Sequence, residues 1–353
     1  MRCALETART PGTPQGPNPR VGCLILDADG HELARGHHRG AGTPHAEADA
    51  LARLPHGARG ATAVVTLEPC AHTGRTGPCA QALIDAGVAR VVYALADPNP
   101  VASGGAEALR AAGVEVVSGL LSDEARDLNR GWLHGLRHGR PLVTWKIAAS
   151  LDGHVAAADG TSQWITSATA RRDAHRLRAE CDAVMIGTGT ALADDPSLTV
   201  RDADGSLAAR IEQPLRAVVG SREIPAGARL RDDAAPLVLL RDGPEAGLAA
   251  LWERGIRHVL LEGGPTLAAS MVRAGLVDEV VAYIAPVLLG AGASAVHDLG
   301  LSTMSEALQL SEPEAVLLGE GAELTVRLRG ALPSVAAPRT TDAATAPEPV
   351  SGK

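Results

Sequence analysis

Four residues in the first quarter of the chain have the types and the spacing of a zinc site that activates water. His45 and Glu47 stand two positions apart, and Cys70 and Cys79 follow. One imidazole and two thiolates fill three corners of a tetrahedral zinc ion and leave the fourth for water. Zinc lowers the pKa of that water, and a nearby carboxylate can carry its proton to a leaving nitrogen. We therefore expect His45, Cys70 and Cys79 to bind one zinc ion per chain, with Glu47 as the proton carrier.

The order of these residues matches the general zinc-deaminase pattern in one half only. The His-x-Glu motif is present, but eight residues separate the two cysteines, where the general pattern has two. Taken singly, each cysteine is more typical of a small buried hydrophobe, and His45 of an ordinary loop histidine. However, His45 and Cys70 both follow a proline, and helix-like runs begin at Ala46 and Cys79. Because a helix N-terminus lowers the pKa of a thiol, the combination favours zinc.

Length and composition limit the classes of protein. The 353 residues predict two domains, and the absence of Phe predicts a core of Ala, Val and Leu. A net charge of −8 argues against a nucleic-acid partner. The odd count of five cysteines is typical of a reducing cytosol, so we expect a cytoplasmic protein. No apolar signal segment follows Met1, and the uncharged run 280–296 is broken by proline and glycine, so no membrane association is expected.

The elements of the first half alternate in a way that predicts an α/β domain. We expect strands at residues 21–26, 31–36, 63–67, 88–94 and 114–117, and helices at 1–9, 46–54, 79–86, 103–113 and 122–135. This alternation predicts a mainly parallel sheet with both faces covered. Ligands bind such sheets at the carboxyl ends of the strands. Residues 68–70 and 97–100 lie there, which agrees with the expected zinc site.

A linker at residues 137–141 divides the chain, so we expect domains at 1–138 and 139–330. In the second, we expect strands at 142–147, 183–186, 218–219, 237–240, 259–262 and 280–284, and a basic helix at 167–180. A further helix is expected to begin in the run Gly263-Gly264-Pro265-Thr266, and residues 187–190 form another run of glycine and threonine. The stretch from 331 to 353 is rich in Ala, Pro and Thr, and we expect it to be disordered.

A series of motifs in both halves resembles one family. The motifs are PNPRVG at 17–22, HAE at 45–47, TLEPCAHTGRT at 66–76, DPNP at 97–100, SLDG at 150–153, SQWIT at 162–166, the run 193–201 and EGGPTL at 262–267. They occur in the order of the bifunctional riboflavin-biosynthesis deaminase–reductases, the RibD family, over about residues 1–330. The eight-residue cysteine spacing is that family's own.

The resemblance implies a cytidine-deaminase-like domain followed by a dihydrofolate-reductase-like domain. It implies zinc-dependent hydrolytic deamination of a diaminopyrimidinone that carries a ribosylamino 5-phosphate. NADPH would then reduce the ribosyl group to ribityl, and the enzyme would be a homo-oligomer. Two rival hypotheses are a single-activity zinc deaminase with an inert or nucleotide-binding second domain, and a zinc-stabilised nucleotide-binding module. A closed structural site would need a fourth protein ligand, and Cys3, Cys23 and Cys181 lack ligand-like neighbours.

In the first domain, the resemblance implies that the zinc residues are His45, Cys70 and Cys79 and that Glu47 moves the proton. The positions that match the substrate pocket are Asn18, His38, His72, Arg75, Asp97 and Asn99. His38 and His72 would otherwise be ordinary loop histidines. Asp97 and Asn99 would otherwise only form turns beside the two prolines.

In the second domain, the resemblance implies three groups of residues. NADPH contacts match Ala149, Trp164, Thr190, Asp194, Ser221, Gly264, Pro265, Thr266, Leu267, Ala268, Ala269 and Ser270. Substrate contacts match Ser162, Arg178, Leu198, Arg201 and Glu262, and either Lys146 or Glu262 could protonate the reduced sugar. Without the resemblance, Arg178 and Arg201 would be solvated charges rather than phosphate ligands. The string Gly290-x-Gly292-x-x-Ala295 fits a dinucleotide fingerprint in letters but lacks its acidic partner, so we expect it to be a decoy.

Overall fold

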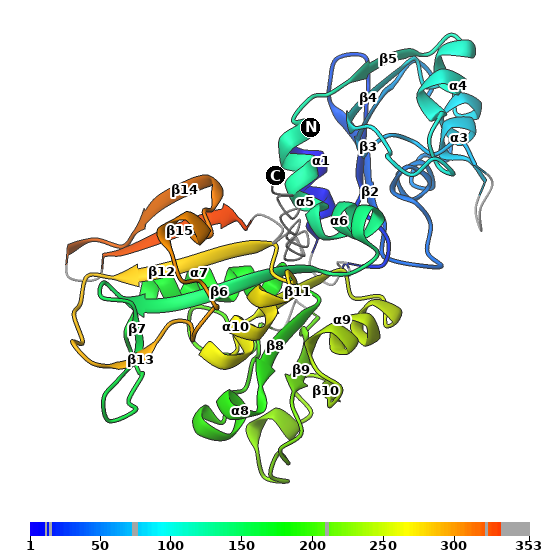
Figure 1. Ribbon diagram of the computed structural model, residues 1–353. Helices are drawn as coiled ribbons and strands as arrows, with labels where there is room; N and C mark the ends of the chain where they lie inside the picture. The colour runs from blue at the N-terminus through cyan, green and yellow to red at the C-terminus, as the bar shows by residue number, and fades with distance from the viewer. Residues whose placement is uncertain (11–12, 14–15, 73–76, 209–211, 322–323, 333–353) are drawn as a thin grey trace, which may run out of the picture.

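The computed structural model describes residues 1–10, 13, 16–72, 77–208, 212–321 and 324–332, which form two lobes, each with its own sheet (Figure 1). The first lobe has a five-stranded sheet in the order β2-β1-β3-β4-β5, with β1 at Gly22–Leu26, β2 at Glu32–His37, β3 at Thr62–Leu67, β4 at Arg90–Leu95 and β5 at Glu115–Ser118. Strand β1 is antiparallel to β2 and β3, whereas β3, β4 and β5 are parallel. The sheet is therefore mixed, with its parallel half towards β5.

Six helices pack against this first sheet: α1 at Arg2–Ala8, α2 at Ala46–Leu51, α3 at Cys79–Asp85, α4 at Gly105–Ala111, α5 at Ser122–Leu128 and α6 at Arg130–His138. Ala50 of α2 and Leu83 of α3 are buried in the same core as Val65 of β3. On the other face, Ala4 of α1 packs on Leu24 and Val64. Small alanines let both helix layers approach the sheet closely, as expected for a chain without Phe.

The prediction of a single helix at 122–135 is wrong, because Asn129 interrupts it. Its side-chain oxygen accepts a hydrogen bond from the backbone N of Arg20 (2.7 Å), and its amide nitrogen donates to the Arg20 carbonyl (3.0 Å). Helix α5 therefore ends at Leu128, and α6 begins in a new direction and runs to His138, into the expected linker. The helix expected at 46–54 is shorter than predicted and ends at Leu51.

The second lobe contains an eight-stranded sheet in the order β10-β9-β8-β11-β6-β12-β15-β14. Its strands are β6 at Leu142–Ser150, β8 at Ala183–Gly187, β9 at Leu215–Val219, β10 at Leu237–Leu240, β11 at His258–Leu261, β12 at Glu279–Ala285, β14 at Ser311–Leu318 and β15 at Thr325–Ala331. The first six strands of that order are parallel, and β15 and β14 continue the sheet in antiparallel fashion. A small hairpin-like pair joins β7 (His154–Ala157) to β13 (Gly292–Ser294).

Helices cover both faces of this second sheet. They are α7 at Ala168–Ala179, α8 at Thr188–Asp194, α9 at Pro244–Glu253 and α10 at Pro265–Arg273, with short 3-10 turns η1 at Arg229–Arg231 and η2 at Met304–Glu306. The glycine–threonine run at 187–190 thus starts helix α8. Strands β13, β14 and β15 were not predicted. Strand β13 is exposed, β14 is mostly exposed and β15 is mostly half-buried, so none of them is a continuous buried apolar run.

The end of the chain departs slightly from the prediction. Ala331 still belongs to β15, and the backbone N of Leu332 donates to the Asp278 carbonyl (2.8 Å). The predicted disorder of residues 333–353 lies outside the described residues. Among the helices that the structure describes, none combines the length and the apolar character needed to cross a bilayer.

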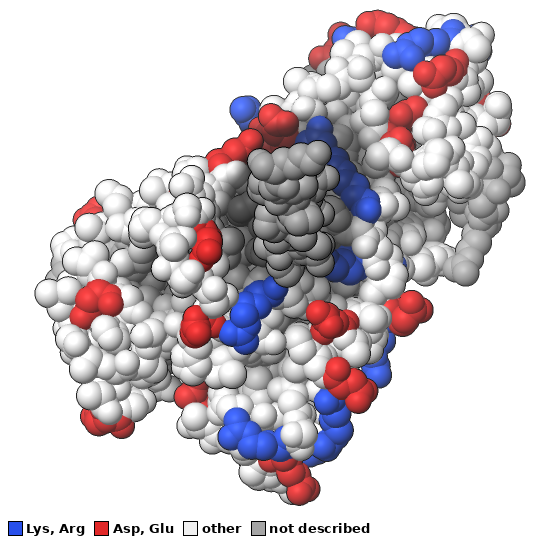
Figure 2. Space-filling model, in the orientation of Figure 1, with Lys and Arg blue, Asp and Glu red and all other residues white. Residues whose placement is uncertain are grey.

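The two lobes meet at helix α6 and at the amino ends of the parallel strands of the second sheet (Figure 1). Arg130 of α6 pairs with Glu180 (3.0 Å), and Arg140 pairs with Asp278, which precedes β12 (2.7 Å). Figure 2 shows Lys and Arg side chains along this junction with carboxylates beside them. The carboxyl ends of the same strands, where ligands are expected, therefore lie away from the junction.

Two candidate active sites

The predicted zinc ligands come together in the first lobe. The Nδ1 atom of His45 lies 3.2 Å from the Cys79 sulfur and 3.6 Å from the Cys70 sulfur, and all three donor atoms lie within 4.8 Å of one another. A tetrahedral zinc ion with bonds of about 2.0–2.3 Å holds its donors about 3.5 Å apart. The three donors therefore fit zinc, and the fourth corner receives no further donor from the described residues.

Three separate elements position these donors. His45 is the residue before helix α2, Cys79 is the first residue of α3, and Cys70 follows β3 at the carboxyl end of that strand. The backbone N of Cys79 donates to the Cys70 sulfur (3.4 Å). A hydrogen bond from the Cys79 thiol, together with the His45 imidazole, lowers the pKa of the Cys70 thiol. A thiolate is thus favoured at the position where a metal ligand must be deprotonated.

Glu47 lies in the first turn of helix α2 and is only 3% exposed. Burial, reinforced by the nearby Cys70 thiolate, raises the pKa of its carboxyl group. No Lys or Arg of the described residues pairs with it. A raised pKa makes the carboxyl group easier to protonate than an exposed glutamate, which suits a proton carrier.

A cavity of about 340 Å³ is lined by His45, Glu47 and Cys70, and Cys79 lies against the other two donors. Five of the six predicted substrate residues line it, namely Asn18, His38, His72, Asp97 and Asn99. The sixth, Arg75, lies outside the described residues. Glu68 and Trp132 also line the cavity and were not predicted. The position of Glu68 directly before the Pro69-Cys70 pair was the available signal, whereas nothing in the sequence linked Trp132, on helix α6, to this site.

Hydrogen bonds fix several of the lining residues. The Nδ1 atom of His38 donates to the Pro44 carbonyl (3.1 Å), so its Nε2 atom accepts from the Asn18 amide (2.9 Å). Burial lowers the pKa of His38, which agrees with a neutral imidazole. Glu68 accepts from the backbone N of Ala106 (3.0 Å) and of Asp97 (3.3 Å), and it thereby holds the loop at 97–100 against helix α4. The Nδ1 atom of His72 is buried without a hydrogen-bond partner among the described residues, and is available to a ligand.

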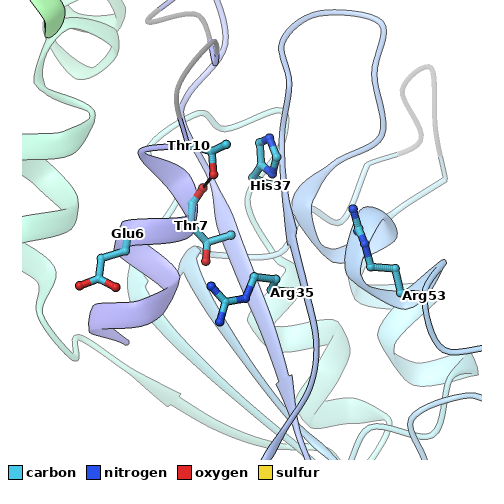
Figure 3. Close-up of a pocket in the computed structure, with 6 residues that line it drawn as sticks. All are labelled: Glu6, Thr7, Thr10, Arg35, His37 and Arg53. Atoms are coloured by element: carbon cyan, nitrogen blue, oxygen red, sulfur yellow. Dashed lines mark hydrogen bonds between the residues drawn. The ribbon is translucent and has the colours of Figure 1, made fainter. Parts of the chain in front are cut away.

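A second hollow in the first lobe contains none of the predicted residues. It has a volume of about 310 Å³ and is lined by Glu6, Thr7, Thr10, Arg35, His37 and Arg53 (Figure 3). Arg35 is paired with Glu32 (2.6 Å) and Arg53 with Asp49 (2.8 Å). Because both cations are already neutralised, the hollow has no chemistry comparable to that of the zinc cavity.

In the second lobe, three predicted residues form one buried ionic cluster on the sheet face that helix α7 covers. The Nζ atom of Lys146, on β6, lies 3.1 Å from Glu262, which follows β11. Arg178 of α7 contacts both oxygens of Glu262, one of them at 2.9 Å, and it also donates to the Thr199 carbonyl (3.0 Å). Arg178 is therefore not a solvated surface charge. Although burial raises the pKa of Glu262, the two cations outweigh it and hold that pKa far below its usual value.

Two loops at the carboxyl ends of β8 and β11 meet beside this cluster. The backbone N of Gly264 donates to the hydroxyl of Thr190 on α8 (2.8 Å), which joins two predicted NADPH contacts directly. A Cβ atom on Gly264 would sit 3.0 Å from that hydroxyl, so the close approach favours glycine. Glycine ahead of a helix leaves backbone N–H groups open to a phosphate, and the arrangement fits a dinucleotide.

The remaining predicted NADPH contacts are spread over the same edge of the sheet. Ala149 is buried on β6, whereas Asp194 and Ser221 are exposed at the ends of α8 and β9. Trp164 is 69% exposed, and the Arg171 guanidinium lies 4.4 Å from its ring centre. On helix α10, the side chains of Ala268 and Ala269 are buried in the core. Only Pro265, Thr266, Leu267 and Ser270 of that run expose side-chain surface.

The predicted substrate residues of the second lobe differ from one another in burial and in surroundings more than those of the first lobe do. Leu198 is buried with φ 52°, and Ser162 is half-buried. Arg201 is exposed, and its guanidinium donates to the Gly205 carbonyl (2.7 Å). Arg178 and Arg201 therefore differ in that only Arg178 lies in the ionic cluster. The string at Gly290–Ala295 lies on the loop after β12 and on strand β13, which pairs with β7. The backbone N of Gly290 already donates to the Asp152 carboxylate (2.7 Å).

Two arginines that sequence reasoning missed flank Ser221. The Nε atom of Arg222 donates to the Thr188 hydroxyl (3.3 Å), and Arg241, which follows β10, donates to the Ser221 carbonyl (3.1 Å). Among the described residues, neither guanidinium forms an ion pair. Their positions, three residues after β9 for Arg222 and directly after β10 for Arg241, were the available signal, because the carboxyl ends of parallel strands bind ligands.

Comparisons with known proteins cover nearly the whole chain. The family model for the RibD C-terminal domain matches residues 141–323, and the model for the cytidine and deoxycytidylate deaminase zinc-binding region matches residues 1–95. The riboflavin biosynthesis protein RibD of Mycobacterium tuberculosis (strain ATCC 25618 / H37Rv) is 52% identical over 295 residues, 83% of this chain and 86% of the relative. RibD of Escherichia coli (strain K12) is 42% identical over 353 residues, 89% of this chain and 94% of the relative.

Two solved structures extend the similarity to the fold. Acinetobacter baumannii RibD superposes with a TM-score of 0.79 at 38% identity, over 94% of this chain and 97% of that one. The diaminohydroxyphosphoribosylaminopyrimidine deaminase/5-amino-6-(5-phosphoribosylamino)uracil reductase of Thermotoga maritima superposes with a TM-score of 0.80 at 31% identity, over the same shares. Both similarities include the two lobes together.

Proposed function

The chain belongs to the RibD family of bifunctional deaminase–reductases in riboflavin biosynthesis, and we propose which of its residues carry each reaction. The protein has a zinc-dependent deaminase domain followed by an NADPH-dependent reductase domain. We place these domains at residues 1–138 and 139–330. We further propose the substrates named for the Thermotoga maritima relative: the deaminase acts on the diaminopyrimidinone ribotide, and the reductase converts the resulting aminouracil ribotide to its ribityl form. The match of a reductase-domain model over 141–323 supports two activities over a single one.

The observation that carries the deaminase proposal is one cavity lined by the zinc donors His45 and Cys70, by Glu47 and by five predicted substrate residues, with the third donor, Cys79, beside the first two. His45, Cys70 and Cys79 would hold the zinc ion, which would supply a water molecule activated near neutral pH. The Glu47 carboxyl group, which lines the same cavity, would accept the proton of that water and deliver it to the leaving amine nitrogen. The raised pKa of Glu47 suits both halves of this transfer, because the group must be easily protonated and deprotonated.

The lining residues are proposed to orient the pyrimidine. The neutral His38 and the Asn18 amide bonded to it form one polar wall. The Asp97–Asn99 turn, held by Glu68, forms another, and the unpartnered Nδ1 of His72 offers a further hydrogen bond. Trp132 closes the cavity with an apolar surface. Such fixed polar groups set the orientation of the amine towards Glu47.

For the reductase, we propose that Lys146 is the proton donor and Glu262 the residue that positions it. NADPH supplies the hydride, and the substrate oxygen that forms must receive a proton. Glu262 is held in its ionised form between Lys146 and Arg178, so it has no proton to give. The ammonium group of Lys146 has a proton that it can donate. Arg178 remains close enough to contribute to a phosphate or hydroxyl contact together with Arg201.

The order of the strands suggests how NADPH lies. The proposed contacts run from Ala149 on β6, through Gly264 after β11 and Thr190 after β8, to Ser221 after β9, which are four adjacent strands. The hydride end must lie near Lys146 on β6, so the adenosine end reaches β9 and β10. Arg222 and Arg241 lie there without ion-pair partners among the described residues. We propose that these two arginines bind the 2′-phosphate that distinguishes NADPH from NADH, as arginine does in other dinucleotide sites.

A coupled assay with the purified full-length chain tests the whole proposal. The diaminopyrimidinone ribotide is added with NADPH, and ammonia and NADPH absorbance are followed together. We expect ammonia release followed by NADPH oxidation in equal amount. Ammonia release without NADPH oxidation would support the single-activity rival, and release of neither would leave a zinc-stabilised binding module.

We also propose a homo-oligomer formed through the reductase domain, in a cytoplasmic setting. The exposed apolar side chains of that domain include Val287, Leu288, Leu301, Met304 and Leu317. Exposed apolar side chains of this size favour contacts between copies. The absence of disulfides among the five cysteines supports a reducing compartment. Light scattering during size-exclusion chromatography measures the oligomeric state directly.

A further inference from the structure

Two walls of the deaminase cavity lie at the junction with the reductase domain. One wall is the loop that contains Pro17, Asn18 and Pro19, and the other is Trp132 on helix α6. Next to both walls are glycines that contact the segment 252–258, which runs from the end of helix α9 to the start of strand β11. The shape of the deaminase cavity is therefore connected to a part of the chain that carries no deaminase residue.

The loop is fastened at both ends. At its start, a Cβ atom on Gly16 would sit 2.5 Å from the Gly255 carbonyl oxygen and 2.6 Å from Cγ of Arg257, so the backbone of Gly16 lies directly against the reductase domain. At its end, the backbone of Arg20 is held in both directions by the Asn129 side chain. Asn18 lies midway, where any displacement of Gly16 would move the amide that is bonded to His38.

Helix α6 rests on the same segment through two glycines. A Cβ atom on Gly131 would sit 3.0 Å from the Arg257 carbonyl oxygen. On Gly135 it would sit 2.7 Å from the Trp252 ring and 3.3 Å from Cδ of Arg257. Trp132 lies between these two contact points, so the packing of α6 on the reductase domain sets how far the indole enters the cavity.

Arg257 contacts both walls and is itself held in place. Its guanidinium carbon lies 3.5 Å from the ring centre of Trp252, and its Nη1 atom donates to the Trp252 and Ile256 carbonyls (3.1 Å each). Its backbone N donates to the carboxylate of Asp182 (2.7 Å). With its head group engaged in this way, the aliphatic stem of the side chain forms a fixed surface for Gly16 and Gly135.

We propose that Arg257, a residue of the reductase domain, is a positioning residue of the deaminase reaction. Its stem holds the loop at 16–20 and helix α6 at the separation that the deaminase cavity requires. This inference rests on the proposed deaminase function. It makes the reductase domain part of the deaminase's framework as well as the second enzyme of the pair.

The test compares three variants of the full chain. In Arg257→Ala, the stem is lost, and we expect the KM for the diaminopyrimidinone ribotide to rise on the order of tenfold with a smaller change in kcat, because the loop binds substrate rather than the reacting atoms. In Arg257→Lys, the stem atoms that contact Gly16 and Gly135 remain, so most of the lost affinity should return. Arg254→Ala removes an exposed arginine three residues away and should leave KM unchanged.

Two further measurements separate positioning from general damage. The zinc content and the reductase KM, measured with the deaminated substrate supplied directly, should be unchanged in Arg257→Ala. Gly16→Ala, which pushes the loop from the deaminase side, should raise the same deaminase KM. An unaltered deaminase KM in both variants, or an equal loss in both reactions, overturns the proposal. Absence of deamination by the wild-type chain would instead refute the proposed function.

Discussion

The two active sites each contain a buried glutamate, and the two differ in their surroundings. Glu47 of the deaminase domain has no Lys or Arg partner among the described residues, and burial raises its pKa. Glu262 of the reductase domain lies between Lys146 and Arg178, and its pKa is held far below the usual value. Environments that shift the pKa values of two carboxyl groups in opposite directions suit the two groups to different roles. Glu47 suits proton transfer, and Glu262 suits holding two cations in place.

The sites also differ in how they are enclosed. The deaminase residues surround a cavity of about 340 Å³, whereas the proposed NADPH contacts are distributed along the carboxyl ends of four strands. A pyrimidine can be oriented by a few side chains that meet at one point. A dinucleotide must be bound along its length, largely by backbone groups of loops. The comparison implies that single substitutions should damage the deaminase more than they damage cofactor binding.

Removal of one zinc ligand should give the largest effect. In Cys70→Ala, we expect zinc binding and ammonia release to fall below detection, because two donors cannot hold the ion in a catalytic geometry. NADPH oxidation with deaminated substrate should continue, since no reductase residue touches this site. Metal analysis and the two separate assays measure this. If Cys70→Ala released ammonia without bound zinc, the deaminase site would not depend on the metal, and the proposed difference between the two sites would be wrong.

Glu47→Gln should give the next largest effect. The amide keeps the shape of the side chain but cannot carry a proton, so we expect kcat for deamination to fall by about 10²–10⁴-fold. Zinc content should stay at one ion per chain, which distinguishes this variant from the loss of a ligand. Full activity in Glu47→Gln would show that the zinc site is structural and that another group moves the proton.

The difference between the sites also explains how much could be predicted from the sequence. His45, Cys70 and Cys79 could be predicted from residue type and spacing, because an imidazole and two thiols beside a His-x-Glu motif are typical of a catalytic zinc site. Lys146 and Glu262 are common residues, and nothing local shows that β6 and β11 place them 3.1 Å apart. They could be selected only through resemblance to a family.

The elements of the fold also divide into those that local sequence predicts and those that it does not. The parallel strands of the second sheet were predicted well, because each is a short apolar run. Strands β14 and β15 were missed, since β14 is mostly exposed, β15 is mostly half-buried, and their pairing is decided by β12. The break at Asn129 depends on the backbone of Arg20, which is 109 residues away in sequence. Contacts of this kind are set by tertiary structure, and local sequence does not contain them.

Glu262→Gln tests the other half of the comparison. Replacing the carboxylate leaves Lys146 and Arg178 side by side without an anion, and we expect a loss of about 3 kcal/mol in unfolding free energy together with a lower reductase kcat. Urea unfolding at pH 7 measures the stability, with Asp233→Asn as an exposed control. An unchanged stability would mean that the cluster is not an organised ion pair.

The pH dependence of that loss has a definite sign. Because the folded pKa of Glu262 is depressed, its contribution is fully present above the unfolded pKa, near 4.3, and is lost only as pH falls through the folded value. The stability difference between wild type and Glu262→Gln should therefore be constant from pH 8 to pH 5. A difference that shrinks between pH 8 and pH 6 would show that Glu262 titrates there and could donate a proton after all.

The smallest effect is expected for cofactor selectivity, because the dinucleotide is bound at many points. In Arg222→Ala, we expect the affinity for NADPH to fall by about tenfold, the size of one charge-assisted contact, and the affinity for NADH to stay the same. Titration calorimetry with NADPH, NADH and adenosine 2′,5′-bisphosphate measures this without turnover. Arg241→Ala should act in the same direction, and Arg231→Ala, whose guanidinium donates to the Ile224 carbonyl, is the matched control. If both cofactors lose affinity equally, the arginines act on the pyrophosphate or on the loop itself. If neither does, the adenosine end of NADPH lies elsewhere, and the order of contacts along β6, β11, β8 and β9 must be reversed.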